Sequence, residues 1–251
     1  MPLSVFLANS EYIDWHHPLV MSVSHNLSVG AANAVDVVRK CFELVSDKIE
    51  NCLDYRRTPI ICRASDVLIY RIGSCYAKSH LFAALLRANA IPAALCYQRL
   101  SRVNSDRPYS LHGLNAVWLK EYGWFRIDAT GIKSGQGVQF CPLVERLPFP
   151  LQADDENLQG RYAEPLPEIT QILTTCATED DLYGKLSDAC MCLNDTSTSA
   201  ALASSPMTGE TAAGNNLPRY DISPGPQVTW SLCSGTLYQC LDTELLDKAK
   251  R

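Results

Sequence analysis

The sequence predicts one α+β domain in which a central helix packs on an antiparallel sheet, and three observations support this fold class. Residues 31–51 place apolar side chains at the spacing of one helical face and charges on the opposite face. Residues 74–88 are apolar on nearly every side in their second half, which is typical of a buried helix. Residues 93–128 contain strand-like runs separated by turn signals, so we expect them to form the sheet.

The N-terminal part of the domain is predicted from its caps and breaks. Residues 1–30 indicate an irregular segment that contains a short helical piece near 19–27. The long helix over 31–51 follows. A looser stretch then leads to a short helix, for which Ser65 is the predicted N-cap and Gly73 the residue that closes it.

The central helix and the strands after it are bounded by equally local signals. Asn89 tolerates the left-handed conformation of a C-cap, and Pro92 prevents the helix from continuing, so the helix is expected to end here. Residues 93–100 predict a strand. Two further strands, 114–119 and 124–128, flank a Lys-Glu-Tyr-Gly turn and predict an antiparallel hairpin.

The C-terminal part divides by composition. Two last helices are predicted at 167–176 and 179–193, and residues 1–193 form the predicted folded domain. Residues 194–226 are rich in Ser, Thr, Ala, Gly and Pro and predict a flexible linker. Residues 227–251 regain large apolar side chains and are expected to be able to dock back on the domain.

Charge and hydropathy exclude some classes of partner. The 251 residues carry 22 Lys and Arg against 27 Asp and Glu, a net charge of −5. No basic face is therefore expected for a phosphate backbone, and nucleic acid is not an expected partner. No apolar run reaches the length of a membrane span, and the N-terminus lacks the basic leader of a signal or transit peptide.

The eleven cysteines do not predict a disulfide framework, because their number is odd and the chain is large. Five of them stand singly within apolar segments, which is typical of buried thiols: Cys41, Cys52, Cys62, Cys96 and Cys176. We expect a reducing, cytoplasmic compartment. No cofactor is expected, and the sequence predicts no oligomeric state.

Cys75 carries the strongest chemical signal. It opens the central helix directly after Gly73 and Ser74. A helix N-terminus stabilises a thiolate through its unpaired N–H groups and its dipole. The same N–H groups can stabilise the oxyanion of a tetrahedral intermediate, and a glycine beside the sulfur leaves room for a substrate.

His112 and Asp128 supply the groups that such a thiol needs. His112 stands at the start of the second strand run and Asp128 at the end of the third. The two positions are roughly symmetric about the hairpin turn, so they can face the same side of the sheet. His112 would act as base for Cys75 and Asp128 would orient the ring, with the sulfur and a ring nitrogen expected within roughly 4 Å.

Rival assignments exist for the base and for a metal site. His80 lies five residues after Cys75 on the same helix and points away from it, so a packing or capping role is favoured. Three other histidines lack a carboxylate or cysteine at a recognised ligand spacing, and turn or surface roles are favoured for them: His16, His17 and His25. Four C-terminal cysteines also fall short of a zinc pattern: Cys190, Cys192, Cys233 and Cys240. Four residues stay open between lining the site and packing the core: Tyr97, Gln98, Trp118 and Trp124.

Three motifs carry a resemblance to a known superfamily: GSCYAKSHLFAALLRANAIP at 73–92, LHGLNAV at 111–117 and WFRIDAT at 124–130. They resemble the transglutaminase-like domain of the papain-like cysteine enzymes, and more narrowly small microbial proteins with this domain. Asp14, His17-Pro18, RASDVL at 63–68 and AEPLP at 163–167 also have counterparts there. The resemblance covers about residues 10–178.

This resemblance implies a papain-like, transglutaminase-like core with Cys75 as nucleophile, His112 as base and Asp128 as orienting acid. It implies an acyl-enzyme on Cys75, a thioester, formed from an amide, ester or thioester and passed to water or to an amine. The substrate expected from it is a small molecule, a peptide or a carrier-bound acyl group. An alternative stays open, in which the same fold serves as a catalytically silent binding module.

Overall fold

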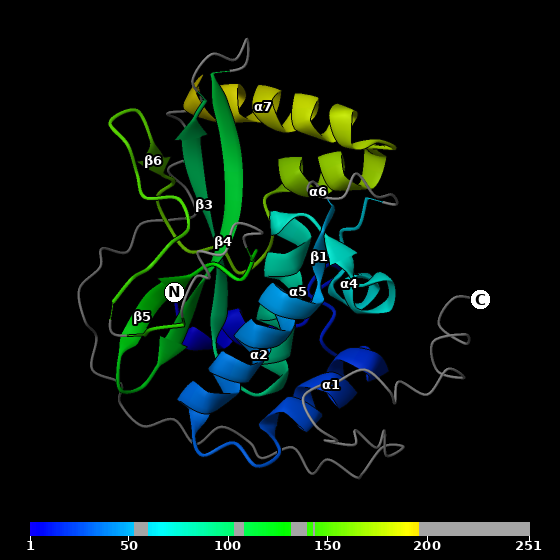
Figure 1. The fold of residues 1–251 in the computed structure, drawn as a ribbon, viewed down its shortest axis with the longest axis vertical. Helices are drawn as coiled ribbons and strands as arrows, with labels where there is room; N and C mark the ends of the chain where they lie inside the picture. The colour runs from blue at the N-terminus through cyan, green and yellow to red at the C-terminus, as the bar shows by residue number, and fades with distance from the viewer. Residues whose placement is uncertain (53–59, 103–107, 132–139, 143, 196–251) are drawn as a thin grey trace. The chain divides into compact units, whose positions relative to one another are not determined.

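The computed structural model describes residues 1–52, 60–102, 108–131, 140–142 and 144–195 (Figure 1). The chain divides into two units, Met1–Ser205 and Pro206–Arg251, and the fold described below belongs to the first. Except for the last residues of α7, the predicted linker and C-terminal segment lie outside the described residues, so their boundaries stay predictions.

The described part of the first unit combines helices with a four-stranded sheet and a short two-stranded sheet. Its helices are the 3₁₀ helix η1 (Leu3–Leu7), α1 (Pro18–Ser28), α2 (Ala34–Lys48), α4 (Ala64–Tyr70), α5 (Cys75–Ala88), α6 (Pro167–Thr175) and α7 (Glu179–Asp195). Its strands are β1 (Glu50–Asn51), β2 (Ile72–Gly73), β3 (Ala93–Ser101), β4 (Tyr109–Leu119), β5 (Gly123–Ile127) and β6 (Glu156–Asn157). The predicted α+β class is confirmed.

Helix α2 is shorter than the predicted helix at both ends. Asn33 caps it by accepting a hydrogen bond from the Asp36 N–H at 3.0 Å, a cap that leaves the preceding residues outside the helix. The predicted end at Asn51 is wrong, because Glu50 and Asn51 leave the helix to pair in parallel with β2. This pairing brings the end of α2 close to the start of α5.

Helix α4 has neither of its predicted caps. Its N-cap position is Arg63, and Ser65 lies inside the helix, where its N–H and hydroxyl both donate to Asp14 at 3.0 and 2.6 Å. The helix closes at Arg71, which adopts a left-handed conformation with φ 55°, while the expected closing residue Gly73 belongs to β2. A carboxylate distant in sequence therefore replaces the local cap.

Helix α5 is the centre of the fold, since every residue from Cys75 to Arg87 is buried. Ser74 caps its N-terminus, and its C-terminus follows the predicted boundary. The left-handed residue is not Asn89 but Ala90, with φ 56°. The Asn89 amide instead donates to the Ser24 main-chain oxygen and hydroxyl and to Leu85 O, which ties α5 to α1.

The sheet has the order β5-β4-β3-β6, and all of its pairs are antiparallel. The predicted hairpin is confirmed, with Asn115 paired to Ile127 and Leu119 paired to Gly123. Strand β4 is longer than predicted because it begins at Tyr109, so His112 lies within the strand and opposite Gln98 of β3.

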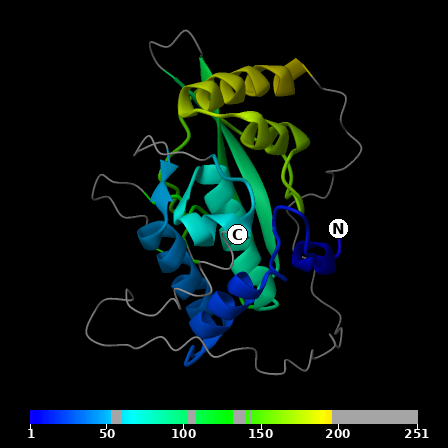
Figure 2. The ribbon, with the colours of Figure 1, turned by 90° about the vertical axis from the view of Figure 1, so that its right-hand side faces the viewer.

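The two faces of the sheet are covered differently. Asn115 of β4 donates its amide to Ser79 O of α5 at 3.0 Å, so α5 packs on one face. A second cluster, formed with Phe6 of η1, covers the opposite face and contains Ala94, Cys96, Leu114 and Ala116. Helices α6 and α7 lie across the end of the long strands away from α1 (Figures 1 and 2). Within the described ranges, no helix combines the length and apolar character needed to cross a membrane.

Candidate active site

Cys75 occupies the first position of α5, and its side chain is buried with 6% exposure. The Ser74 hydroxyl accepts from the Ala77 N–H, so the cap side chain lies beside the sulfur-bearing turn. The N–H groups of a first helical turn have no partner within the helix, and they point toward the sulfur's side of the helix end. The sequence-predicted placement of the thiol is therefore reproduced.

Strand β4 approaches this helix end very closely. A Cβ on Gly113 would lie 2.9 Å from the Tyr76 ring, closer than a side chain tolerates. The Tyr76 hydroxyl also donates to the main-chain oxygen of Leu111. The residue after Cys75 is thus packed against the residues on either side of His112, which brings the thiol and the imidazole together.

His112 contacts both predicted partners. Its Nε2 lies 2.6 Å from Oδ2 of Asp128, and its ring also forms a side-chain hydrogen bond with Cys75. Because Nε2 is occupied by the carboxylate, Nδ1 is the nitrogen that remains for the sulfur. The hairpin register places Asp128 one step beyond the Asn115–Ile127 pair, so it is a diagonal neighbour of His112 on the same face.

The charge state of His112 follows from these contacts. Burial by itself lowers the pKa of the imidazole, since the charged form loses hydration. The negative charges of Asp128 and Cys75, with their hydrogen bonds, outweigh burial and raise the pKa of His112 to about 10. The structure therefore favours an imidazolium at neutral pH.

Asp128 is held as a carboxylate. It is 1% exposed, and burial would raise its pKa, but the His112 charge and the hydrogen bonds from His112 and from the Thr130 main chain lower it. The Thr130 N–H donates to Oδ1 at 2.7 Å, while Oδ2 faces His112. Each oxygen thus has a partner, which fixes the orientation of the acid.

His80 has a different role. It is 1% exposed and its Nδ1 lies 2.8 Å from the main-chain oxygen of Cys62, to which it donates. Burial lowers the pKa of His80 to about 4, with a further contribution from Arg87 that opposes the effect of the Cys62 bond. A neutral imidazole bound to a carbonyl is a packing residue, as its helical position predicted.

The remaining cysteines differ from Cys75 in their surroundings. Burial raises the pKa of three thiols to about 12: Cys41, Cys62 and Cys96. The seven cysteines whose side chains are described are all free: Cys41, Cys52, Cys62, Cys75, Cys96, Cys141 and Cys176. The side chains of Cys190 and Cys192, like Cys233 and Cys240, lie outside the described set.

Among the residues that the structure describes, no three His, Cys, Asp or Glu side chains form a group that could hold a metal ion. His17 caps α1, since its Nδ1 accepts from the Leu19 N–H at 3.2 Å. The ring of His16 packs edge-on against Trp15. These two histidines have the turn roles that were favoured for them.

Two of the four residues that the sequence left open between site and core make packing contacts. Tyr97 packs against Tyr76 and Tyr162, and its hydroxyl accepts from the Leu166 N–H. Trp124 lies against Phe6 on the far face of the sheet. The sequence missed Phe149, whose ring centroid lies 4.9 Å from that of His112. Its position between Pro148 and Pro150, where an exposed aromatic is fixed by rigid neighbours, was the available signal.

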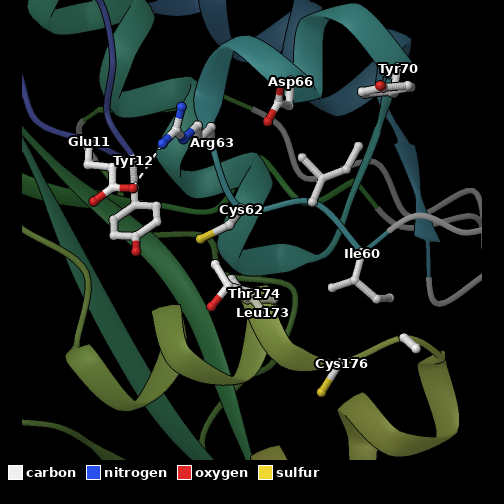
Figure 3. A pocket seen from close by; sticks show the side chains of 12 residues that line it. Glu11, Tyr12, Ile60, Cys62, Arg63, Asp66, Tyr70, Leu173, Thr174 and Cys176 are labelled. Carbon is white, nitrogen blue, oxygen red and sulfur yellow. Dashed lines mark hydrogen bonds and ion pairs between the residues drawn. The ribbon is translucent and has the colours of Figure 1, made fainter.

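A separate groove lies between α4, with the segment before it, and α6 (Figure 3). Its volume is about 650 Å³, and its polar rim includes the ion pair of Arg63 with Glu11 at 2.9 Å. Cys62 lines it, whereas Cys75, His112 and Asp128 do not. The groove is therefore distinct from the thiol site.

Comparison with known proteins gives one family match and several similar solved structures. Residues 22–129 match the Transglutaminase-like superfamily, a segment that contains Cys75, His112 and Asp128. No curated protein sequence matches the chain.

Among solved structures, a candidate cysteine protease from Cytophaga hutchinsonii is similar at 23% identity and a TM-score of 0.43, over 51% of this chain and 42% of that one. The periplasmic domain of TgpA from Pseudomonas aeruginosa is similar at 18% identity and a TM-score of 0.40, over 52% of this chain and 48% of that one. The chain thus spans less than half the length of either structure.

Proposed function

We propose that this chain, whose residues 22–129 place it in the transglutaminase-like superfamily, is a thiol-dependent acyl-transfer enzyme that uses Cys75, His112 and Asp128. The observation that carries the proposal is the contact chain from the Cys75 sulfur through the His112 ring to the Asp128 carboxylate. Nucleophile, base and orienting acid in mutual contact are the arrangement that covalent catalysis by a thiol requires.

The reaction proceeds in two halves. The Cys75 thiolate attacks the carbonyl carbon of an amide, ester or thioester, and the oxyanion that forms is stabilised by N–H groups at the start of α5. The His112 imidazolium then gives the proton on Nδ1 to the leaving group, and the intermediate collapses to a thioester on Cys75. Asp128 compensates the charge of His112 whenever the ring is an imidazolium.

In the second half, water or an amine attacks the thioester carbonyl. His112, now neutral, takes the proton of the incoming nucleophile, and the thiolate leaves Cys75 with the ion pair restored. We propose a small molecule, a peptide or a carrier-bound acyl group as the acyl donor. The free state of the described thiols supports a reducing, cytoplasmic location.

The test is intact mass spectrometry after incubation with p-nitrophenyl acetate, a small activated ester. The expected result is one acetyl adduct per chain that is absent from Cys75→Ala. Cys62→Ala is the matched control, since it removes a buried thiol outside the site and should retain the adduct. Equal labelling of wild type and Cys75→Ala would refute the acyl-enzyme on this residue.

The alternative, a silent binding module, predicts a different reactivity. Without activation, Cys75 would react with iodoacetamide no faster than a buried thiol such as Cys62 near neutral pH. The proposal instead expects iodoacetamide to alkylate Cys75 at least about a hundredfold faster than Cys62. The pKa of the Cys62 thiol is about 12, so almost none of it is thiolate at pH 7.

A further inference from the structure

Lys78 is a buried cation three residues after Cys75 on α5. It is 1% exposed, although it lies close to the thiol end of the helix. Its side-chain stem passes beneath Gly73, where a Cβ would lie 3.4 Å from the lysine Cγ. The stem is thus packed directly under the segment that leads into Cys75.

The ammonium of Lys78 joins two other segments. Its Nζ donates to the main-chain oxygen of Ile49 at 2.8 Å and to that of Thr130. Ile49 is the C-cap residue of α2, and Thr130 follows Asp128 by two residues. Lys78 therefore connects the nucleophile helix both to α2 and to the turn that carries the acid.

Thr130 is held through both of its main-chain polar groups. Its N–H donates to Asp128 Oδ1 at 2.7 Å, while its C=O accepts from Lys78. A closed ring of contacts results, from α5 through Lys78 and Thr130 to Asp128, and back through His112 to Cys75. Any movement of this turn changes the place of the carboxylate relative to the imidazole.

The turn has little freedom of its own. Gly131 has φ 71°, and a Cβ there would lie 2.5 Å from the Ser46 main-chain oxygen of α2. The turn therefore packs directly on α2, whose end is also bound by Lys78 through Ile49. Three segments meet at this one ammonium.

Stability by itself does not explain a lysine here. Burial of an ammonium costs free energy unless hydrogen bonds compensate it, and a well-packed apolar residue of similar volume is often neutral or more stabilising at such a site. The distinctive property of lysine is a long reach with several N–H donors, and these donors hold the Thr130 carbonyl.

We propose that Lys78 is a positioning residue of the acyl-transfer site: it holds the turn of Asp128 at a fixed place relative to the helix of Cys75. This role rests on the proposed function. It assigns Lys78 no contact with substrate, since it acts through Thr130 and Asp128.

The test uses Lys78→Met, which keeps the stem and removes the donors. The second-order rate of Cys75 alkylation by iodoacetamide is measured at pH 6.5 to 9, together with near-ultraviolet circular dichroism and the melting temperature. We expect the rate at pH 6.5 to fall at least tenfold. Lys78→Gln, which restores N–H donors on a shorter stem, should recover part of it, and it also serves if Lys78→Met does not fold.

Arg87→Met is the matched control. Arg87 is a second buried cation on α5, and it donates to the carbonyls of Ala93, Ala8 and Ala163, none of which belongs to the Asp128 turn. Its loss should lower the melting temperature without changing the alkylation profile of the folded protein. A folded Lys78 variant with the wild-type profile would overturn the positioning role alone, whereas a wild-type Cys75 no more reactive than Cys62 would overturn the proposed function as well.

Discussion

The replacement Asp128→Asn tests the source of the charge on His112. Asparagine has nearly the same size and keeps an acceptor oxygen, so the hydrogen bond from the ring can survive while the negative charge is lost. In the wild type, burial lowers the pKa of His112 and the charge of Asp128 is the largest opposing effect. We expect the variant to fold and its imidazole to lose the proton that the wild type holds.

The size of the expected pKa change follows from the ordinary pKa of a histidine and the pKa of His112 in the folded protein. The pKa of His112 is raised from 6.5 to about 10, and the variant should bring it down toward 6.5, because burial persists and only the contribution of Cys75 still raises it. The difference is about 3.5 pKa units, which corresponds to roughly 5 kcal/mol between the two protonation states. If the pKa falls to 6.5, the imidazolium share of His112 at pH 8 falls from about 99% to about 3%.

Nuclear magnetic resonance of the histidine Cε1–H groups measures this directly, because the chain has only 5 histidines. The wild type should show one resonance that titrates near pH 10 and one, from His80, near pH 4. In Asp128→Asn the titration near pH 10 should move toward pH 6.5, and turnover at pH 8 should drop by about tenfold to thirtyfold. An unchanged titration near pH 10 in the variant would show that Asp128 does not hold the charge.

Two further predictions concern stability. Because the pKa of His80 is lowered from 6.5 to about 4 in the folded chain, His80 binds a proton in the unfolded chain but not in the folded chain between these two pH values. The contribution of His80 to the free energy of unfolding is therefore present at pH 7 and is lost as the pH falls. In urea unfolding, the free energy of unfolding of the wild type should fall by about 2 kcal/mol more than that of His80→Gln between pH 7 and pH 5. An equal fall in the two proteins would refute a buried, neutral His80. Gly131→Ala should lower the free energy of unfolding by about 2 to 4 kcal/mol, since the residue has a positive φ and the new Cβ would lie 2.5 Å from a main-chain oxygen. Gly123→Ala, where φ is 68° and no atom lies within 4 Å of the new Cβ, should lower it by about 1 kcal/mol. Equal midpoint shifts in urea for the two alanine variants would show that the packing of Gly131 on Ser46 is not restrictive.

The sequence predicted what depends on neighbouring residues. The central helix and the hairpin were visible because each is encoded within about 15 residues. The errors occur where a distant group intervenes. Asp14 takes the hydroxyl of Ser65, which therefore does not cap α4, and the parallel pairing of Asn51 with Gly73 ends α2 early and draws the predicted closing glycine into a strand.

The same distinction between local and distant determinants applies to the residues of the candidate active site. Cys75, His112 and Asp128 could be named from residue type and hairpin symmetry, since each stands at the end or edge of a predicted element. Lys78 could not be distinguished within the sequence, because a lysine in a mostly apolar helix is usually assigned to the solvent face. Only the meeting of α2, α5 and the turn after β5 gives its ammonium carbonyl partners.

His80 and His112 show why the position of a carboxylate, and not burial, selects the base. Both rings are buried, and burial lowers the pKa of both. His80 bonds to a main-chain carbonyl and stays neutral, whereas His112 bonds to a carboxylate and is held as a cation beside a thiol. The carboxylate is within reach because β4 and β5 pair Asn115 with Ile127, so Asp128, the first residue after β5, falls on the face of His112. A shift of this register by one residue would turn Asp128 to the opposite face and leave both histidines in the state of His80.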